Sequence, residues 1–371
     1  DTDRSRGLGD VYKRQGKNLM TKFYSEWSGM PSYEFVDLRT ERSAVPIGKV
    51  VKDSIQFKTP FYRKILESIQ RYSIYIGLGS PKQSELKREN IANGIVVTTW
   101  KKSFQSLEFL SHDKGYTLAK GGLHSKDDPR VIWANPGEAL ADPDVASMYP
   151  SFIVNYGVSP HHLSSKVFLG IVEWLRTTRL DAKHNGRKLE ADALKIVINR
   201  IYGALNDAMD YLYDPECTYT VTINLQLLLC NLIESFELNG FDVLSANTDG
   251  LLIRRPNDRL DLFNHICKEW EDYSKLSLDT EVFEKYCRSA VNDYIAVGYG
   301  FYDALQEYNR CGVWIDSKGN TYTTRQAIED KFIKFKGYFL QDPEYNKGFV
   351  YPVVKKALKA VSYTHLTLPT T

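Results

Sequence analysis

The sequence predicts a mixed α+β fold in which an antiparallel sheet packs against helices. Phe241 to Ala246 and Leu251 to Arg254 are two apolar runs around a polar tip, which is typical of a β-hairpin. Residues 164–183 and 189–205 are helix-like runs separated by an Asn-Gly turn, which predicts a helical hairpin. A chain of 371 residues, 43% hydrophobic and 25% charged, has room for two or three domains.

The chain before residue 130 carries fewer signals. A helix is expected from Pro60 to Tyr72 and a strand from Gly94 to Thr99. The turn that begins at Gly121-Gly122 and runs to Ser125 is interpreted as a domain edge.

An amphipathic helix is expected between the two hairpins. It ends at Asn239-Gly240, and we interpret its apolar face as core. That face comprises Val221, Leu225, Leu228, Leu229, Leu232, Ile233 and Phe236. The richest apolar run, Leu225 to Ile233, is interrupted by Asn231 and is shorter than the roughly 18 residues that span a bilayer, so no membrane partner is expected.

Cysteine usage and charge add weaker constraints. The five cysteines include no CxxC, so neither a zinc site nor a disulfide framework is expected, and a reducing, cytoplasmic setting fits best. Net charge is only +2, but residues 161–200 hold eight Lys/Arg against four Asp/Glu, and residues 331–360 hold seven against two. Both segments suit phosphates, although most such runs are simply solvated faces.

Asp144 opens the stretch DVASMYPS, which predicts the end of a strand turning into a helix. Pro150 is compatible with the first helical turn. Asp144 would then lie beside backbone amides that can receive phosphate oxygens. Tyr149 would lie next to the sugar of a nucleotide bound there, leaving little room for a 2′-hydroxyl.

The second helix of the predicted hairpin carries Lys195, Asn199 and Tyr202 at i, i+4 and i+7, so they share one face. Four isoleucine and valine positions are expected to pack behind that face: Ile196, Val197, Ile198 and Ile201. A lysine ammonium is a suitable point charge for a triphosphate.

The first helix carries a second basic stripe, at Arg176, Arg179 and Lys183. An antiparallel hairpin would bring the two stripes together. Each stripe alone is more often solvent-facing than functional.

Asp249 occupies the tip of the predicted β-hairpin, in SANTDG. Two carboxylates, Asp144 and Asp249, delivered to one point with a Lys/Asn/Tyr helix between them suit divalent metals and a triphosphate. The chemistry indicated is nucleotidyl transfer.

The three stretches, in this order, resemble family B DNA-dependent DNA polymerases, with the nearest likeness to viral and phage members. The family patterns are DxxSLYPS, KxxxNSxYG and YxDTDS, and order and spacing agree from Asp144 to Ile253. The resemblance implies a polymerase palm with an antiparallel sheet, helical-hairpin fingers and a partial thumb.

The resemblance also implies a domain layout. Residues 16–130 flank the palm, 131–160 and 206–330 form it, 161–205 are the fingers, and 331–360 begin the thumb. Residues 1–15 and 361–371 resemble translated adaptor sequence at the edges of a metagenomic fragment, or else are disordered native tails. The family's exonuclease carboxylates are not recognisable, because Asp37 and Glu41 are too far apart.

The family's site residues carry over as expectations. Asp144 and Asp249 would be catalytic and, with Val145, would bind two Mg²⁺, or Mn²⁺ in their place, about 3.5 to 4 Å apart. Tyr149 resembles the steric gate against ribonucleotides. The remaining nucleotide-binding positions would be Ser147, Met148, Arg179, Lys183, Lys195, Asn199 and Tyr202. The primer 3′-hydroxyl would attack the α-phosphorus of a dNTP, releasing pyrophosphate.

The chain departs from the family patterns at several positions. Asn247 stands in place of the first aspartate of the third motif, two residues before Asp249, with Thr248 between them; Gly250 and Arg200 each replace a serine. The family's lysine-x-tyrosine element would align with residues 292–294, where Tyr294 lacks its lysine, and Lys334 and Lys336 are candidate replacements for that charge.

The resemblance implies primer-template DNA and dNTPs as partners, with a terminal protein or processivity factor left open. It points to a DNA-directed DNA polymerase of a phage or virus, acting in the host cytoplasm. An RNA-templated or RNA-synthesising polymerase is an alternative, which Tyr149 and the lack of a YxDD motif disfavour. A non-catalytic nucleic-acid-binding remnant is another, given Asn247 and the partial chain.

Overall fold

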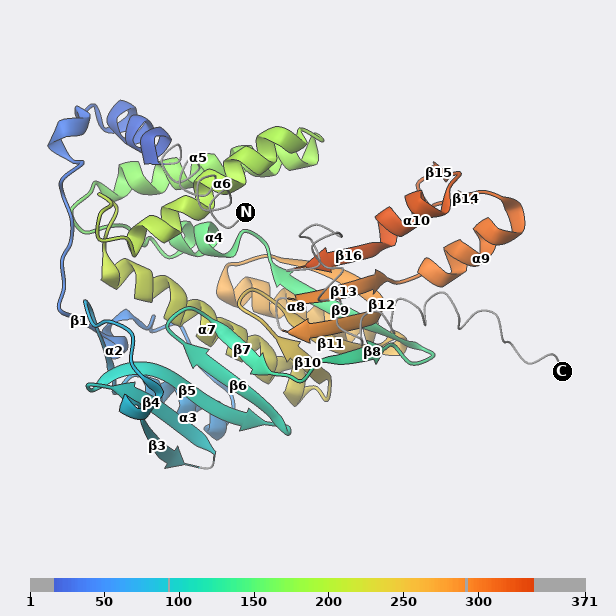
Figure 1. The fold of residues 1–371 in the computed structure, drawn as a ribbon, viewed down its shortest axis with the longest axis horizontal. Helices are drawn as coiled ribbons and strands as arrows, with labels where there is room; N and C mark the ends of the chain where they lie inside the picture. The colour runs from blue at the N-terminus through green and yellow to red at the C-terminus, as the bar shows by residue number, and fades with distance from the viewer. Residues whose placement is uncertain (1–16, 93, 291–292, 337–371) are drawn as a thin grey trace.

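The fold is described by a computed structural model covering residues 17–92, 94–290 and 293–336 (Figure 1). Its strands form two seven-stranded sheets and one two-stranded sheet, with nearly all neighbours antiparallel. This confirms the predicted mixed α+β class. The expected tails, 1–15 and 361–371, and most of the expected thumb segment lie outside the described residues.

The first sheet is built from the region before residue 130. Its order is β1-β2-β5-β4-β3, with β6 on β5 and β7 on β6. The strands are β1 (Ala44–Pro46), β2 (Ser73–Tyr75), β3 (Lys87–Ala92), β4 (Ile95–Trp100), β5 (Ser103–Ser111), β6 (Lys114–Ala119) and β7 (Leu123–Lys126). Two helices accompany it, α2 (Ile47–Val50) and α3 (Pro60–Ile69), the latter where a helix was expected.

The predicted domain edge at residues 121–125 is wrong. Gly121 and Gly122 turn between β6 and β7, and Leu123 to Ser125 pair with β6 in the same sheet. A glycine pair marks a tight turn, and a tight turn closes a hairpin as readily as it ends a domain. The chain passes to the second sheet only after β7.

The second sheet has the order β10-β11-β9-β12-β13-β16, with β8 also on β12. Its strands are β8 (Arg130–Trp133), β9 (Glu138–Val145), β10 (Asp242–Ala246), β11 (Leu251–Pro256), β12 (Leu278–Ala290), β13 (Asp293–Gly298) and β16 (Ile333–Lys336). β9 lies between β11 and β12, so the strand that ends near Asp144 runs directly beside the predicted β10–β11 hairpin.

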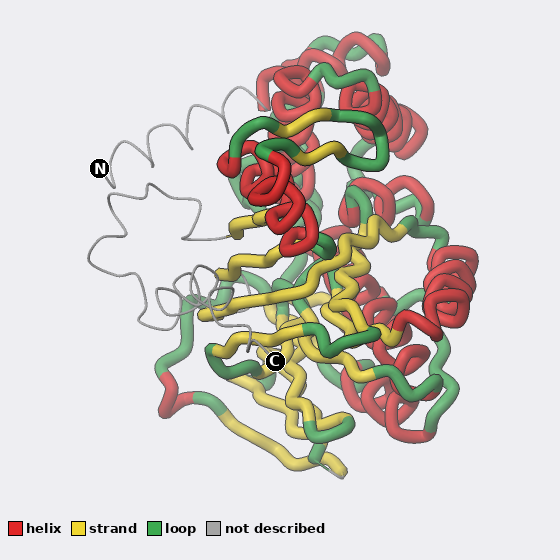
Figure 2. The backbone as a smooth tube through the Cα atoms, turned by 90° about the vertical axis from the view of Figure 1, so that its right-hand side faces the viewer, coloured by secondary structure: helices red, strands yellow, loops and turns green. Residues whose placement is uncertain are grey.

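The remaining helices lie after β9 in the chain. They are α4 (Met148–Asn155), α5 (Ser165–His184), α6 (Lys188–Leu205), α7 (Pro215–Leu238), α8 (Leu260–Ser274), α9 (Phe301–Cys311) and α10 (Arg325–Phe332), with the small pair β14 (Trp314–Ile315) and β15 (Thr321–Tyr322) between the last two. α5 and α6 form the predicted hairpin, which projects past the sheets beside the helix at residues 17–28 (Figure 1). The perpendicular view in Figure 2 shows the helices gathered above and to one side of the strands.

α7 is the central helix of the larger core, and it is buried almost all round rather than on one face as predicted. Its polar side chains are satisfied by the backbone near the first sheet. Asn224 accepts from Lys52 N at 2.7 Å, Gln226 bonds both N and O of Ala119, and Glu234 accepts from Thr59 N at 2.7 Å. α7 is long and apolar enough to span a bilayer, but 83% of its apolar window is buried in the fold, as in the core helix of a globular domain.

Candidate functional site

The two aspartates singled out by sequence meet where β9 runs beside the β10–β11 tip. Val145 N donates to Asp249 O at 2.7 Å, and Asp144 forms an antiparallel bridge with Gly250. A Cβ on Gly250 would lie 3.0 Å from Pro143 O and 3.1 Å from an Asp144 carboxylate oxygen. Glycine at this position therefore permits the close approach of the two acidic segments.

The tip that carries Asp249 is closed by Asn247. The backbone N of Asn247 donates to Gly250 O at 3.0 Å, and its side-chain oxygen accepts from Asp249 N at 3.0 Å. This is an Asx turn, in which the side chain imitates a backbone turn. Thr248 faces Gly122 of the first sheet, where a Cβ would lie 3.0 Å from the threonine side chain.

Negative charge is concentrated at this point. Burial, followed by the charges of Asp249 and Asp142, raises the pKa of Asp144 to about 7. Burial likewise raises the pKa of Asp142 to about 6. Asp142 was not predicted as a site residue, although its position two residues before Asp144 on the same strand places it on the same face.

Strand β12 brings two more carboxylates alongside. Asp279 pairs with Asp144 in register, and Glu281 pairs with Asp142. Lys183 Nζ lies 3.5 Å from Asp279, so the helical hairpin reaches the sheet here. Neither Asp279 nor Glu281 was predicted to lie near Asp144, because the sequence of a single strand does not show which residues of another strand pair with it.

A cavity of about 410 Å³ opens beside the two aspartates. Every residue proposed from sequence as catalytic, metal-binding or nucleotide-binding lines it. They are Asp144, Val145, Ser147, Met148, Tyr149, Arg179, Lys183, Lys195, Asn199, Tyr202 and Asp249, joined by Ala146, Pro150, Leu180, Ile198 and Asp279. The residues that line the cavity thus come from β9, α4, α5, α6, β12 and the tip before β11.

Direct contacts fix several of these side chains. Tyr149 of α4 stacks on Tyr202 of α6, with ring centroids 4.1 Å apart. Ser147 precedes α4 with a left-handed φ of 49°, and its hydroxyl accepts from Arg179 Nη1 at 2.7 Å. These two contacts therefore join the end of β9 and the start of α4 to the α5–α6 hairpin across the cavity.

The two basic stripes meet only in part. Arg179 and Lys183 line the cavity, whereas Arg176 is occupied by Glu173, with Nε 2.8 Å from the carboxylate. Behind the α6 stripe, Val197, Ile198 and Ile201 are buried, but Ile196 is 40% exposed, so its expected packing is wrong. Ile196 directly follows Lys195, and a step of about 100° turns it away from the core.

The positions at which the chain departs from the family patterns, and the residues near them, do not line the cavity: Asn247, Thr248, Tyr294, Lys334 and Lys336. Asn247 and Thr248 act at the tip, as described above. Tyr294 is buried in the second sheet and stacks on Tyr286 at 4.5 Å. Lys334 bonds Glu281, and Lys336 lies over the Tyr294 ring at 5.7 Å. Both lysines nevertheless act on the acidic cluster, since their charges oppose the rise in the pKa of Asp142 and Asp144.

Comparison with known proteins gives distant partial matches, and no family model matches the chain. A DNA polymerase of Thermococcus gorgonarius is 27% identical over 190 residues, covering 42% of this chain and 24% of the relative. DNA polymerase II of Escherichia coli is 25% identical over 170 residues, covering 38% and 22%. The matched part spans about a quarter of the length of these relatives.

A solved structure also resembles the chain. The family B DNA polymerase of Pyrobaculum calidifontis has 16% identity and a TM-score of 0.35, covering 47% of this chain and 28% of that one.

Proposed function

Since this chain is a partial relative of the family B DNA polymerases, we propose that it contributes the catalytic core of template-directed DNA synthesis. The activity would add dNTPs to a primer 3′-hydroxyl by two-metal nucleotidyl transfer, releasing pyrophosphate. The observation that supports this best is that all eleven residues named for it from sequence line one cavity. The likeness of the three sequence stretches to viral and phage members of the family supports a role in replicating a phage or viral genome in the host cytoplasm.

The acidic pair suits Mg²⁺ or Mn²⁺, which prefer oxygen ligands. Asp144 and Asp249 would hold the ions with the Val145 carbonyl. The raised pKa of Asp144 fits this role, because burial and then the neighbouring charges of Asp249 and Asp142 disfavour its ionisation until a cation is bound. When bound, the ions would lower the pKa of the 3′-hydroxyl and stabilise the charge on the leaving pyrophosphate.

The hairpin residues would receive the triphosphate. Arg179 and Lys183 of α5 and Lys195 of α6 line the same cavity as the aspartates of the sheet. Lys183 is held by Asp279 at 3.5 Å, a pair between exposed side chains that costs little to exchange for a phosphate. Asn199 would border the nascent base pair, with Tyr202 and the backbone of Ser147 and Met148.

Tyr149 would exclude ribonucleotides. Its ring stacks on Tyr202, so moving it away from a 2′-hydroxyl would break that contact. This favours DNA over RNA synthesis, and therefore disfavours the RNA-polymerase alternative.

The second candidate is a nucleic-acid-binding remnant without activity. One contact favours it: the Asn247 side-chain oxygen is engaged by Asp249 N, so it is committed to the tip and not to a metal. This reading predicts primer-template binding without extension.

The deciding experiment is extension of a labelled primer on a DNA template with dNTPs and Mg²⁺, alongside a binding assay on the same duplex. Magnesium-dependent extension supports the polymerase; binding alone supports the remnant. Asn247→Asp separates the cases further, because only a remnant disabled at this position would gain activity from it. A chain that neither extends nor binds the duplex contradicts both readings.

A further inference from the structure

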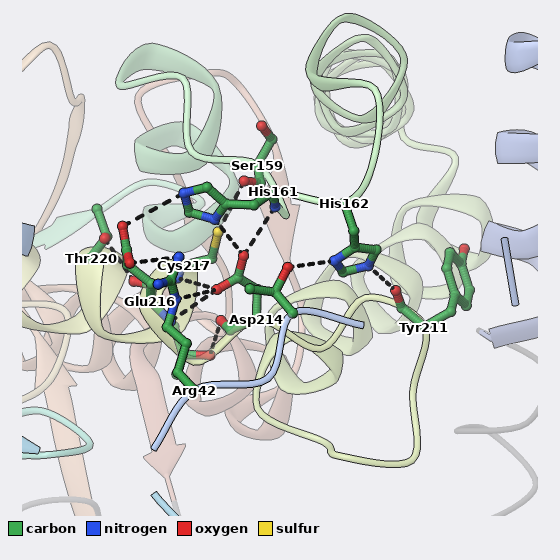
Figure 3. Close-up of polar contacts among 11 residues, drawn as sticks. Arg42, Ser159, His161, His162, Tyr211, Asp214, Glu216, Cys217 and Thr220 are labelled. Atoms are coloured by element: carbon green, nitrogen blue, oxygen red, sulfur yellow. Dashed lines mark hydrogen bonds and ion pairs between the residues drawn. The ribbon is translucent and has the colours of Figure 1, made fainter. Parts of the chain in front are cut away.

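We propose that a zinc-type transition metal binds at the base of the α5–α6 hairpin, where His161, Asp214 and Cys217 meet (Figure 3). One ligand atom of each, the imidazole Nδ1 or Nε2, a carboxylate oxygen and the thiol sulfur, lies within 4.8 Å of the others. None of the three lines the cavity at Asp144, so this site is independent of the proposed DNA synthesis.

The three residues come from the two connections that join the hairpin to the rest of the fold. His161 lies in the segment that enters α5, while Asp214 and Cys217 lie at the start of α7, after the chain leaves α6. A shared ion would cross-link the two connections. Its role would therefore be structural, fixing the base from which the hairpin projects.

The donors are placed as a closed structural site requires. Asp214 and Cys217 are 0% and 3% exposed, whereas the His161 side chain is 52% exposed and leaves a path for an ion. His161 Nδ1 is 2.6 Å from Asp214 Oδ2, and Cys217 Sγ donates to Ser159 O at 3.0 Å. Tetrahedral zinc sets its nitrogen and oxygen ligands about 3.3 Å apart, so the imidazole must retreat by roughly 0.7 Å. Ser159 O or water would complete the four ligands.

The surroundings supply an orienting partner for the imidazole. With Nδ1 on the metal, the ring proton sits on Nε2, which lies 3.6 Å from Glu216 Oε1. Arg42 Nη2 holds that carboxylate at 2.8 Å. A carboxylate behind a metal-bound histidine is the usual arrangement around zinc. Asp214 Oδ1 accepts from the amides of Glu216 and Cys217, at 3.0 and 3.4 Å. Oδ2 accepts from His161 N at 3.0 Å, and its second lone pair would bind the ion.

The donor types select the metal, because a thiol and an imidazole suit Zn²⁺ or Co²⁺ and not the oxygen-preferring Mg²⁺. Arg42 Nε, 3.9 Å from Asp214, and the positive end of α7 oppose any cation here, so the ligand bonds must outweigh their charge. Burial raises the pKa of the Cys217 thiol, so the ion must displace its proton. The S–H bond breaks, the metal–thiolate bond forms and the proton leaves to solvent. Zn²⁺ and Co²⁺ bind thiolate strongly enough for this, whereas Mg²⁺ does not.

The test uses the full chain, stripped of metal with a chelator and titrated with Co²⁺. We expect a thiolate-to-cobalt charge-transfer absorption that saturates at one ion per chain and persists in excess Mg²⁺. Cys217→Ser should abolish the absorption, and His161→Ala should weaken cobalt binding about tenfold or more. Cys311→Ser is the matched control, an exposed thiol outside the cluster that should leave the absorption unchanged.

A second measurement guards against misfolding of Cys217→Ser. His161 is half exposed, so His161→Ala should fold, and Zn²⁺ should raise the unfolding temperature of the parent but not of this variant. No absorption in the parent overturns the proposal, as does an absorption that survives Cys217→Ser or equal stabilisation of both proteins by Zn²⁺. None of these readouts requires primer extension, so the polymerase proposal fails or stands separately.

Discussion

Tyr149 and Tyr202 stack with their ring centroids 4.1 Å apart and their planes 17° from parallel. One ring belongs to the helix that follows the β9 strand, and the other to the second helix of the hairpin. The stack couples the sheet end of the cavity to its helical wall. Tyr149, the proposed steric gate against the ribose 2′-hydroxyl, is thus held in place by Tyr202, which is proposed to border the nascent base pair.

Tyr149→Ala is expected to raise ribonucleotide incorporation relative to dNTP incorporation, because the ring beside the sugar is removed. Tyr202→Ala should shift the ratio in the same direction but less, since it only frees the Tyr149 ring. The ratio of kcat/KM for matched rNTP and dNTP measures both effects. Tyr33→Ala, at a 75% exposed ring away from the cavity, is the control. An unchanged ratio in Tyr149→Ala removes the gate assignment.

Asp144→Asn and Asp249→Asn are expected to lower primer extension by at least about a hundredfold while leaving duplex binding largely intact. Each removes a charge proposed to hold a metal and leaves a side chain of similar size. Single-turnover extension at saturating Mg²⁺ is the measurement. Asp261→Asn, outside the cavity on α8, should behave as the parent. Residual extension within about tenfold of the parent contradicts the metal-ligand roles.

Metal-free stability is expected to fall as pH rises from about 4 to 7. Asp144 has its pKa raised from 3.8 to about 7, so in this window the folded state binds a proton that the unfolded state has lost. The cost of ionising the carboxyl is of order 2 kcal/mol after allowing for its partial exposure.

Urea unfolding at pH 5 and pH 8 in chelator measures this slope. Asp144→Asn should make the slope shallower, leaving the part due to Asp142, whose pKa is raised to about 6, and should be more stable than the parent at pH 8. Mg²⁺ should offset the loss in the parent alone. A parent whose stability rises between pH 5 and pH 8 contradicts the prediction.

Gly250→Ala is expected to destabilise the fold by about 1 to 3 kcal/mol, because its Cβ would press on Pro143 O and the Asp144 carboxylate. The displaced aspartate should also reduce extension. Gly203→Ala is the matched control, since nothing lies within 4 Å of its Cβ position in α6 and alanine favours a helix. Thermal unfolding of both variants decides, and equal stabilities would contradict the close approach at Gly250.

The elements that bear the site could be predicted because their signals are local. The Asn-Gly turn, the Pro150 position and the polar tip at Asp249 each sit within a short stretch of sequence. Spacing also placed Lys195, Asn199 and Tyr202 on one helix face, and all three line the same cavity.

What escaped prediction depends on contacts between distant segments. Asp279 becomes a neighbour of Asp144 only through the register of β12 on β9. His161 and Cys217 are 56 residues apart, so no short spacing announces their cluster. The turn at Gly122 was predicted to be a domain edge because the neighbouring sequence does not show that Gly122 faces Thr248 in the folded chain. The all-round burial of α7 was missed for the same reason, since its polar residues find partners only in the tertiary fold.

Those partners on α7 set a limit on how the protein can be divided. Asn224, Gln226 and Glu234 are bonded to backbone atoms at residues 50–59 and 119. A fragment trimmed to begin at residue 131 would lose these bonds and would expose to water the apolar side of α7 that packs on α2, α3 and β1, at about 25 cal/mol per Å² of apolar surface. The region before residue 130 therefore shares one folding unit with the cavity-bearing sheet, and an expression boundary placed between them would cut through a common core.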